Sequence, residues 1–153
     1  DSGTVGAAIE AASFGILTMA ISQEVTRDDI KFENGENDVD FTHAKKMLNK
    51  IAKIVLKKGL PEGIDLLNVN VPENPVDDEF EIVHLSERMY VPVMEKRADP
   101  RGRPYYWIGG EPYSSHKEGS DGYELIIKQK TTITPLKIDL TGDLKSLRDF
   151  LEI

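Results

Sequence analysis

The sequence predicts an α/β fold built on a parallel β-sheet, and three observations lead to this prediction. Stretches with helical periodicity alternate with short apolar runs over residues 1–72. Residues 16–22 are almost continuously apolar, as expected for a strand that is covered on both faces. The resulting helix–strand–helix–strand order is typical of the crossover connections between parallel strands.

Two helices are predicted in this half from the spacing of apolar residues and from their end signals. Residues 4–14 form the first helix, and Gly15 follows its last turn. Residues 41–58 form the second helix, which Asp40 can cap and which Gly59 ends. The apolar faces consist of Val5, Ala8, Ile9 and Ala12 in the first helix and of Phe41, Ala44, Met47, Leu48, Ile51, Ile54 and Val55 in the second.

A second strand is predicted over residues 64–71, and Pro72 closes it. Residues 23–40 separate the first strand from the second helix. They are acidic and polar and contain the turn signal Asn34-Gly35, so they are expected to form a surface loop.

In the second half of the chain, the sequence predicts short strands, an arm-like hairpin and a terminal helix. Residues 99–104 are dense in turn formers and lead into the aromatic run 105–108, a pattern that favours a hairpin. Residues 144–151 are expected to form a helix that Thr141 or Asp143 caps. The other predicted elements are strands at residues 80–85, 88–94, 123–127 and 131–134 and a polar loop at 111–122.

The composition argues against several classes of function. The formal charge of −8 would repel a nucleic-acid backbone. No apolar stretch approaches the roughly 20 residues that span a bilayer. Cysteine is absent, which excludes a thiol nucleophile, a disulfide and a thiolate metal site within these residues. Together with the lack of a basic secretory flank, this predicts a cytoplasmic protein.

The opening turn Ser2-Gly3-Thr4 is the first candidate site. A small hydroxyl-and-glycine turn that begins a helix can bind an anion, because the first backbone N–H groups lack partners and carry the positive end of the helix dipole. The alternative is an ordinary helix cap, in which the same hydroxyls only satisfy backbone donors.

Other residue groups have a structural interpretation beside a functional one. Asn68 and Asn70 end a predicted buried strand, where sheet-based sites form, although their amides can instead anchor the following loop. The aromatic run with its neighbouring arginines could stack bases, but packing or subunit contact suits an acidic chain better. The remaining groups are the scattered His43, His84 and His116, expected to be surface or structural residues, and the acidic pairs Asp28-Asp29 and Asp77-Asp78, which could hold a hard metal ion or be solvated loop acids.

An ordered set of segments across nearly the whole chain resembles the SurE family (survival protein E). Each segment is modest alone, but their order and spacing make the set specific. The segments are residues 2–8 (SGTVGAA) with Glu10, 67–72 (LNVNVP), 99–102 (DPRG), 106–109 (YWIG), 119–121 (GSD, where the family usually has GTD), 133–136 (ITPL) and 139–141 (DLT).

The resemblance implies a Rossmann-like three-layer α/β/α fold, with residues 1–75 as the second part of that domain and 76–153 as a C-terminal extension with a hairpin and a tail helix. It implies a metal-dependent phosphomonoesterase, a 5'-nucleotidase or acid phosphatase, acting on nucleoside 5'-monophosphates with Mg²⁺ or Mn²⁺. Ser2, Gly3 and Thr4 match the family's phosphate-holding turn. A homodimer or tetramer with exchanged C-terminal segments is also implied.

The sequence departs from the family pattern at the metal ligands. The family's ligands are an aspartate pair, a serine and an asparagine that precede the serine-glycine-threonine turn, so they are expected upstream of this chain. The chain is therefore expected to be the carboxyl-terminal part of such an enzyme, to bind metal poorly alone and to turn over little. The alternatives are a non-catalytic oligomerisation module and a nucleotide-binding module without hydrolysis.

Overall fold

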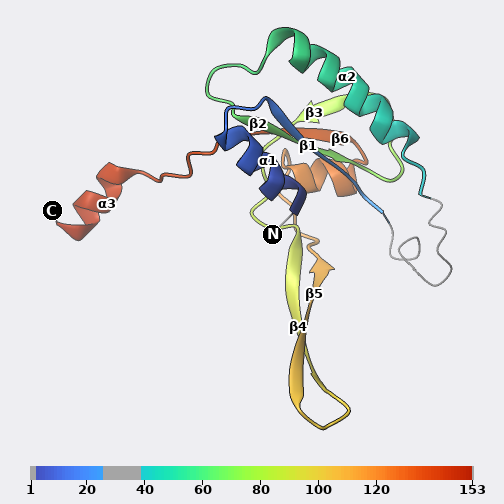
Figure 1. The fold of residues 1–153 in the computed structure, drawn as a ribbon, viewed down its shortest axis with the longest axis vertical. Helices are drawn as coiled ribbons and strands as arrows, with labels where there is room; N and C mark the ends of the chain where they lie inside the picture. The colour runs from blue at the N-terminus through green and yellow to red at the C-terminus, as the bar shows by residue number, and fades with distance from the viewer. Residues whose placement is uncertain (1–2, 26–38, 153) are drawn as a thin grey trace.

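The computed structural model of the chain describes residues 3–25 and 39–152. Helices and strands alternate in its first half, and an antiparallel pair of strands projects from its second half (Figure 1). The elements are α1 (Gly3–Ser13), β1 (Thr18–Gln23), α2 (Thr42–Lys58), β2 (Leu66–Val71), β3 (Phe80–Ile82), β4 (Tyr90–Ala98), β5 (Pro104–Pro112), the π-helical turn η1 (Tyr123–Ile127), β6 (Thr131–Leu136) and α3 (Leu144–Leu151).

The central sheet has four strands in the order β1-β2-β6-β3. The strands β1 and β2 are parallel, with Thr18 opposite Leu66, as the crossover pattern predicts. The strand β6 pairs antiparallel with β2 and parallel with β3, so the sheet is mixed. The predicted Rossmann-like α/β class is confirmed.

Helices cover both faces of this sheet. The helix α2 lies on one face, and α1 and η1 lie on the other (Figure 1). On the α2 side, Ile51 packs with alternate apolar residues of β2 and with Ile133. On the α1 side, Ala8 and Ala12 pack on Ala20 and Leu66, so the helix backbone comes close to the sheet.

The prediction of a strand at residues 123–127 is wrong. These residues form η1, in which Lys128 N donates to Tyr123 O and Leu125 is buried. A short apolar run has the same pattern in a strand and in a buried helical turn. In the structure the run leads into β6, which pairs with β2 and β3, and it takes no part in the sheet itself.

The other predicted elements are present, most of them with shifted ends. The hairpin of β4 and β5 pairs nine residues on each side, more than the sequence predicts, and Asp99 Oδ1 accepts from the N–H groups of Arg101 and Arg103 at its turn, each at 2.8 Å. The helix α3 has its predicted bounds, with Asp143 as the cap. Of the predicted loop at 23–40, residues 26–38 lie outside the described residues. The domain division after residue 75 stays a prediction, and β3 and β6 share the sheet of β1 and β2.

Candidate functional site

The start of α1 lies toward the carboxyl ends of β1 and β2. A short link at residues 14–17 reverses the chain between α1 and β1, and α1 packs on both strands. In open α/β sheets, ligands bind at this edge. Gly3 and Thr4 are exposed in the first turn of α1, whereas Ser2 lies outside the described residues. The first turn therefore has the position that an anion-binding role requires, with its N–H groups at the positive end of the helix.

The start of α2 is tied to the same edge by side-chain contacts. Gln23 Nε2 donates to the Asp40 carbonyl at 2.9 Å, and Asp40 Oδ1 accepts from the Thr42 N–H at 2.8 Å. Hydrogen bonds from Thr42 hold the pKa of Asp40 below its usual value. These residues line a hollow of about 350 Å³ together with Pro72 after β2. The Gln23 Oε1 atom is buried there and has no partner among the described residues.

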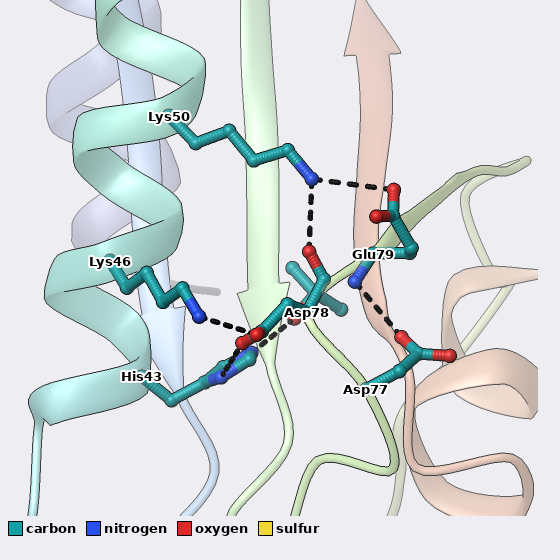
Figure 2. Close-up of polar contacts among 7 residues, drawn as sticks. His43, Lys46, Lys50, Asp77, Asp78 and Glu79 are labelled. Atoms are coloured by element: carbon teal, nitrogen blue, oxygen red, sulfur yellow. Dashed lines mark hydrogen bonds and ion pairs between the residues drawn. The ribbon is translucent and has the colours of Figure 1, made fainter.

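Asp78 is the centre of a charged network between α2 and the segment that follows β2 (Figure 2). Lys46 forms an ion pair and a hydrogen bond with Asp78, and His43 Nδ1 lies 3.5 Å from the same carboxylate. The hydrogen bond from Lys46 is the main cause that lowers the pKa of Asp78. Lys50 contacts Glu79 Oε2 at 3.3 Å and the Asp78 carbonyl at 2.9 Å. Through these contacts the network holds α2 against the segment that follows β2.

The described residues do not fit a divalent metal ion. Among residues 3–25 and 39–152, no group of three or more His, Asp or Glu side chains is placed to hold one. Of the two acidic pairs, Asp77 accepts from the Glu79 N–H at 2.9 Å and Asp78 is paired with Lys46. The other pair, Asp28-Asp29, lies outside the described residues.

Asn68 and Asn70 point to the face of the sheet that α1 covers, because they alternate with the residues that face α2. Neither side chain forms a hydrogen bond with a described residue. No contact among the described residues therefore supports the interpretation that these amides anchor the following loop. The antiparallel register places Thr134 opposite Asn68 and Thr132 opposite Asn70. Sequence reasoning missed these threonines, because a run of alternating residues does not reveal its partner strand.

The other histidines and the aromatic run belong to the hairpin and its base. His84 and His116 line a cleft of about 320 Å³ at the base of the hairpin. His116 packs so closely on Gly122 that a Cβ there would lie 2.2 Å from the ring. Tyr105, Tyr106 and Trp107 are exposed on β5, so they are not core residues within this chain.

The first 92 residues of the chain match a known protein family. The model of the family "Survival protein SurE" matches residues 1–92, which include α1, β1, α2, β2 and β3. The chain belongs to the SurE family. Relatives named 5'-nucleotidase SurE from Methanobrevibacter smithii and Archaeoglobus fulgidus are 65% and 52% identical to it, over 99% and 94% of this chain.

A solved SurE structure has the same fold. The crystal structure of the SurE protein from Aquifex aeolicus superposes with a TM-score of 0.71 at 31% identity, over 99% of this chain and 58% of that one. The chain spans 58% and 54% of the lengths of the Methanobrevibacter and Archaeoglobus relatives. In residues 3–25 and 39–152, no helix is both long and apolar enough to cross a bilayer.

Proposed function

We propose that this chain is part of a metal-dependent phosphomonoesterase that hydrolyses nucleoside 5'-monophosphates in the cytoplasm. The observation that carries the proposal is the position of α1, whose first turn contains Gly3 and Thr4 of the family's motif and lies at the carboxyl edge of β1 and β2. The matched relatives named 5'-nucleotidase support the substrate class.

In this proposal, the start of α1 holds the phosphate group. The N–H groups of Gly3 and Thr4 have no partner within α1 and lie at the positive end of its dipole. The hydroxyl of Thr4 adds a donor in the same turn. Such preorganised donors stabilise the negative charge that grows on the phosphoryl oxygens during transfer.

A divalent ion, Mg²⁺ or Mn²⁺, belongs to this proposal as a group held by residues other than the described ones. When bound, such an ion activates water and offsets phosphoryl charge. The described acidic residues at the edge are engaged with lysines or backbone N–H groups. The contribution of this chain is therefore binding and orientation of the phosphate.

The proposal is tested by binding and hydrolysis measured on the full 153-residue chain. We expect AMP and inorganic phosphate to bind weakly, and Thr4→Ala to weaken both several-fold because one donor is lost. With Mn²⁺ added, hydrolysis of AMP or p-nitrophenyl phosphate should be close to background. Full activity of this chain would overturn the metal assignment, and absence of phosphate binding would overturn the role of the turn.

We also propose that the hairpin and α3 join copies of the chain into a dimer or tetramer. The cross-strand register separates two faces of the hairpin. One face carries a self-contained network, in which Arg97 bonds Glu95 at 2.7 Å and lies over the ring of Trp107. The opposite face carries exposed apolar side chains without such a network, namely Tyr90, Met94, Tyr106 and Ile108. This second face is the one suited to a partner.

The terminal helix has the same character. No residue of α3 is buried, and Leu144, Leu147, Phe150 and Leu151 are all more than half exposed. The helix stands apart from the sheet at the end of an extended segment (Figure 1). An amphipathic helix with an uncovered apolar stripe normally packs on another surface.

Light scattering tests this assembly. Deleting residues 143–153 should lower the measured mass, because the α3 contact is lost. An unchanged mass would remove α3 from the interface. Loss of oligomers without loss of phosphate binding would separate assembly from the binding role of α1.

A further inference from the structure

A row of polar side chains crosses the sheet beneath the start of α1. The parallel register of β1 and β2 places Ser22 opposite Asn70, and the antiparallel register of β2 and β6 places Asn70 opposite Thr132. Residues directly opposite in neighbouring strands share one face. We call Ser22, Asn70 and Thr132 the polar row.

The polar row lies on the α1 face of the sheet. Leu66 packs with Ala8 and Ala12 of α1, and Asn70 is four residues further along the same strand, so it points to the same side. The row lies one residue before the ends of β1 and β2. It is therefore at the carboxyl edge, on the side where α1 begins.

Standard dimensions place the row under the first turn of α1. From Ala12 back to Thr4 the helix rises about 12 Å, at about 1.5 Å per residue. From Leu66 to Asn70 the strand advances about 13 Å, at about 3.3 Å per residue. Because α1 runs antiparallel to β2 and its Ala12 packs in one cluster with Leu66, Thr4 lies near the level of Asn70.

The side chains of the row have unused hydrogen-bonding capacity. Thr132 is fully buried, and its Oγ1 has no hydrogen-bond partner among the residues that the structure describes. The side chains of Ser22 and Asn70 are half-buried and form no hydrogen bond with a described residue. Buried polar groups in native proteins are nearly always bonded, and unbonded ones call for an explanation.

We propose that Asn70, flanked by Ser22, binds the hydroxyl-bearing alcohol part of the phosphate ester that α1 holds. The proposal rests on the proposed function, and it makes Asn70 a specificity-determining residue for a sugar phosphate over free phosphate. Thr132 lies opposite Asn70 on β6 and is fully buried, so no contact with the ligand is assigned to it.

The chemistry of the row favours a sugar over a second phosphate. An amide and a hydroxyl are neutral and can both donate and accept, which matches sugar hydroxyls. Glu81 of β3 lies opposite Thr132 and forms an ion pair with Lys130 at 2.6 Å. The positive charge of Lys130 is therefore already neutralised and is not free to attract a second phosphate to the row. Adjacent strands are about 4.8 Å apart, so Asn70 lies within a sugar's reach of a phosphate above β1.

The test is an NMR chemical-shift titration of the full chain with inorganic phosphate and with ribose 5-phosphate. The unchanged chain should bind ribose 5-phosphate about 3- to 10-fold more tightly, as expected for one or two added hydrogen bonds. Asn70→Ala should remove this preference and leave phosphate affinity unchanged. Thr4→Ala should weaken both ligands equally.

Asn49→Ala is the matched control, because Asn49 is an exposed asparagine of α2 that should leave both affinities unchanged. Asn70→Ser replaces Asn70→Ala if the alanine variant does not give a dispersed spectrum, with the same expected loss of preference. The inference is refuted if the Asn70 variant still prefers ribose 5-phosphate. It is also refuted if the unchanged chain binds phosphate but shows no such preference. Either result leaves the proposed function standing. Failure of both ligands to bind would refute the two together.

Discussion

The sheet with α1 and α2 and the arm with α3 use the same residue types in opposite ways. In β2, Leu66, Val69 and Val71 are fully buried, whereas every residue of β4 is exposed. Polar side chains such as Thr132 lie inside the sheet body, and large apolar ones such as Ile108 lie outside on the arm. The body therefore folds around its own core, and the arm presents apolar area that a second surface can cover.

Two methionines show that the residue type alone does not determine whether a side chain is buried. Met47 of α2 is fully buried, and Met94 of β4 is 69% exposed. Both belong to amphipathic elements, and only the presence of a packed partner separates them. The same type of substitution made in the body and in the arm tests this difference.

The largest expected difference is between Met47→Ala and Met94→Ala. The first change should lower the free energy of unfolding by about 2–5 kcal/mol, because it leaves a cavity in the core. The second should change it by less than about 0.5 kcal/mol, because that side chain is exposed. Urea denaturation followed by circular dichroism measures both. Equal losses would mean that the arm is part of the same folding core.

A smaller difference is expected between two glycines. Gly59 ends α2 with φ 73° and ψ −170°, a conformation that glycine adopts readily and other residues do not. Gly59→Ala should therefore cost about 1–3 kcal/mol, although a Cβ would meet no atom of a described residue within 4 Å. Gly142 lies before α3 without a positive φ and is equally open, so Gly142→Ala is the control and should leave the unfolding midpoint unchanged.

The smallest effect concerns two aspartates with lowered pKa values. Lys46 lowers the pKa of Asp78 in the body, and Ser146 lowers that of Asp143 at the start of α3. A carboxylate with a lowered pKa in the folded state stabilises the fold above the unfolded pKa, and that contribution is lost as the pH falls through the folded pKa. The relevant window therefore lies at and below about pH 4.

Asp78→Asn should reduce the loss of unfolding free energy between pH 6 and about pH 3. Asp143→Asn should leave that loss unchanged, because α3 buries no residue in the body. Denaturation midpoints at the two pH values provide the measurement. A larger effect at Asp143 would show that α3 unfolds together with the sheet.

Much of the fold was predictable because local signals and burial agree. The apolar spacing of α2 and the glycine after it predicted that helix to within one residue, and the aspartate cap predicted the bounds of α3. In the candidate site, the sequence predicted the helix that begins at this turn, and the structure places the start of that helix at the carboxyl edge of β1 and β2. The phosphate role of Ser2, Gly3 and Thr4 stays a proposal.

The remaining features depend on contacts between distant segments. Residues 123–127 form a buried helical turn outside the sheet, although their apolar run suits a strand equally well. The polar row depends on the register in which β6 pairs with β2, which no local pattern in its threonines records. The sequence alone thus determined where helices and most strands form, through local periodicity and end signals. The tertiary structure decided which side chains meet, because strand pairing is a long-range choice made by the packing of the whole sheet.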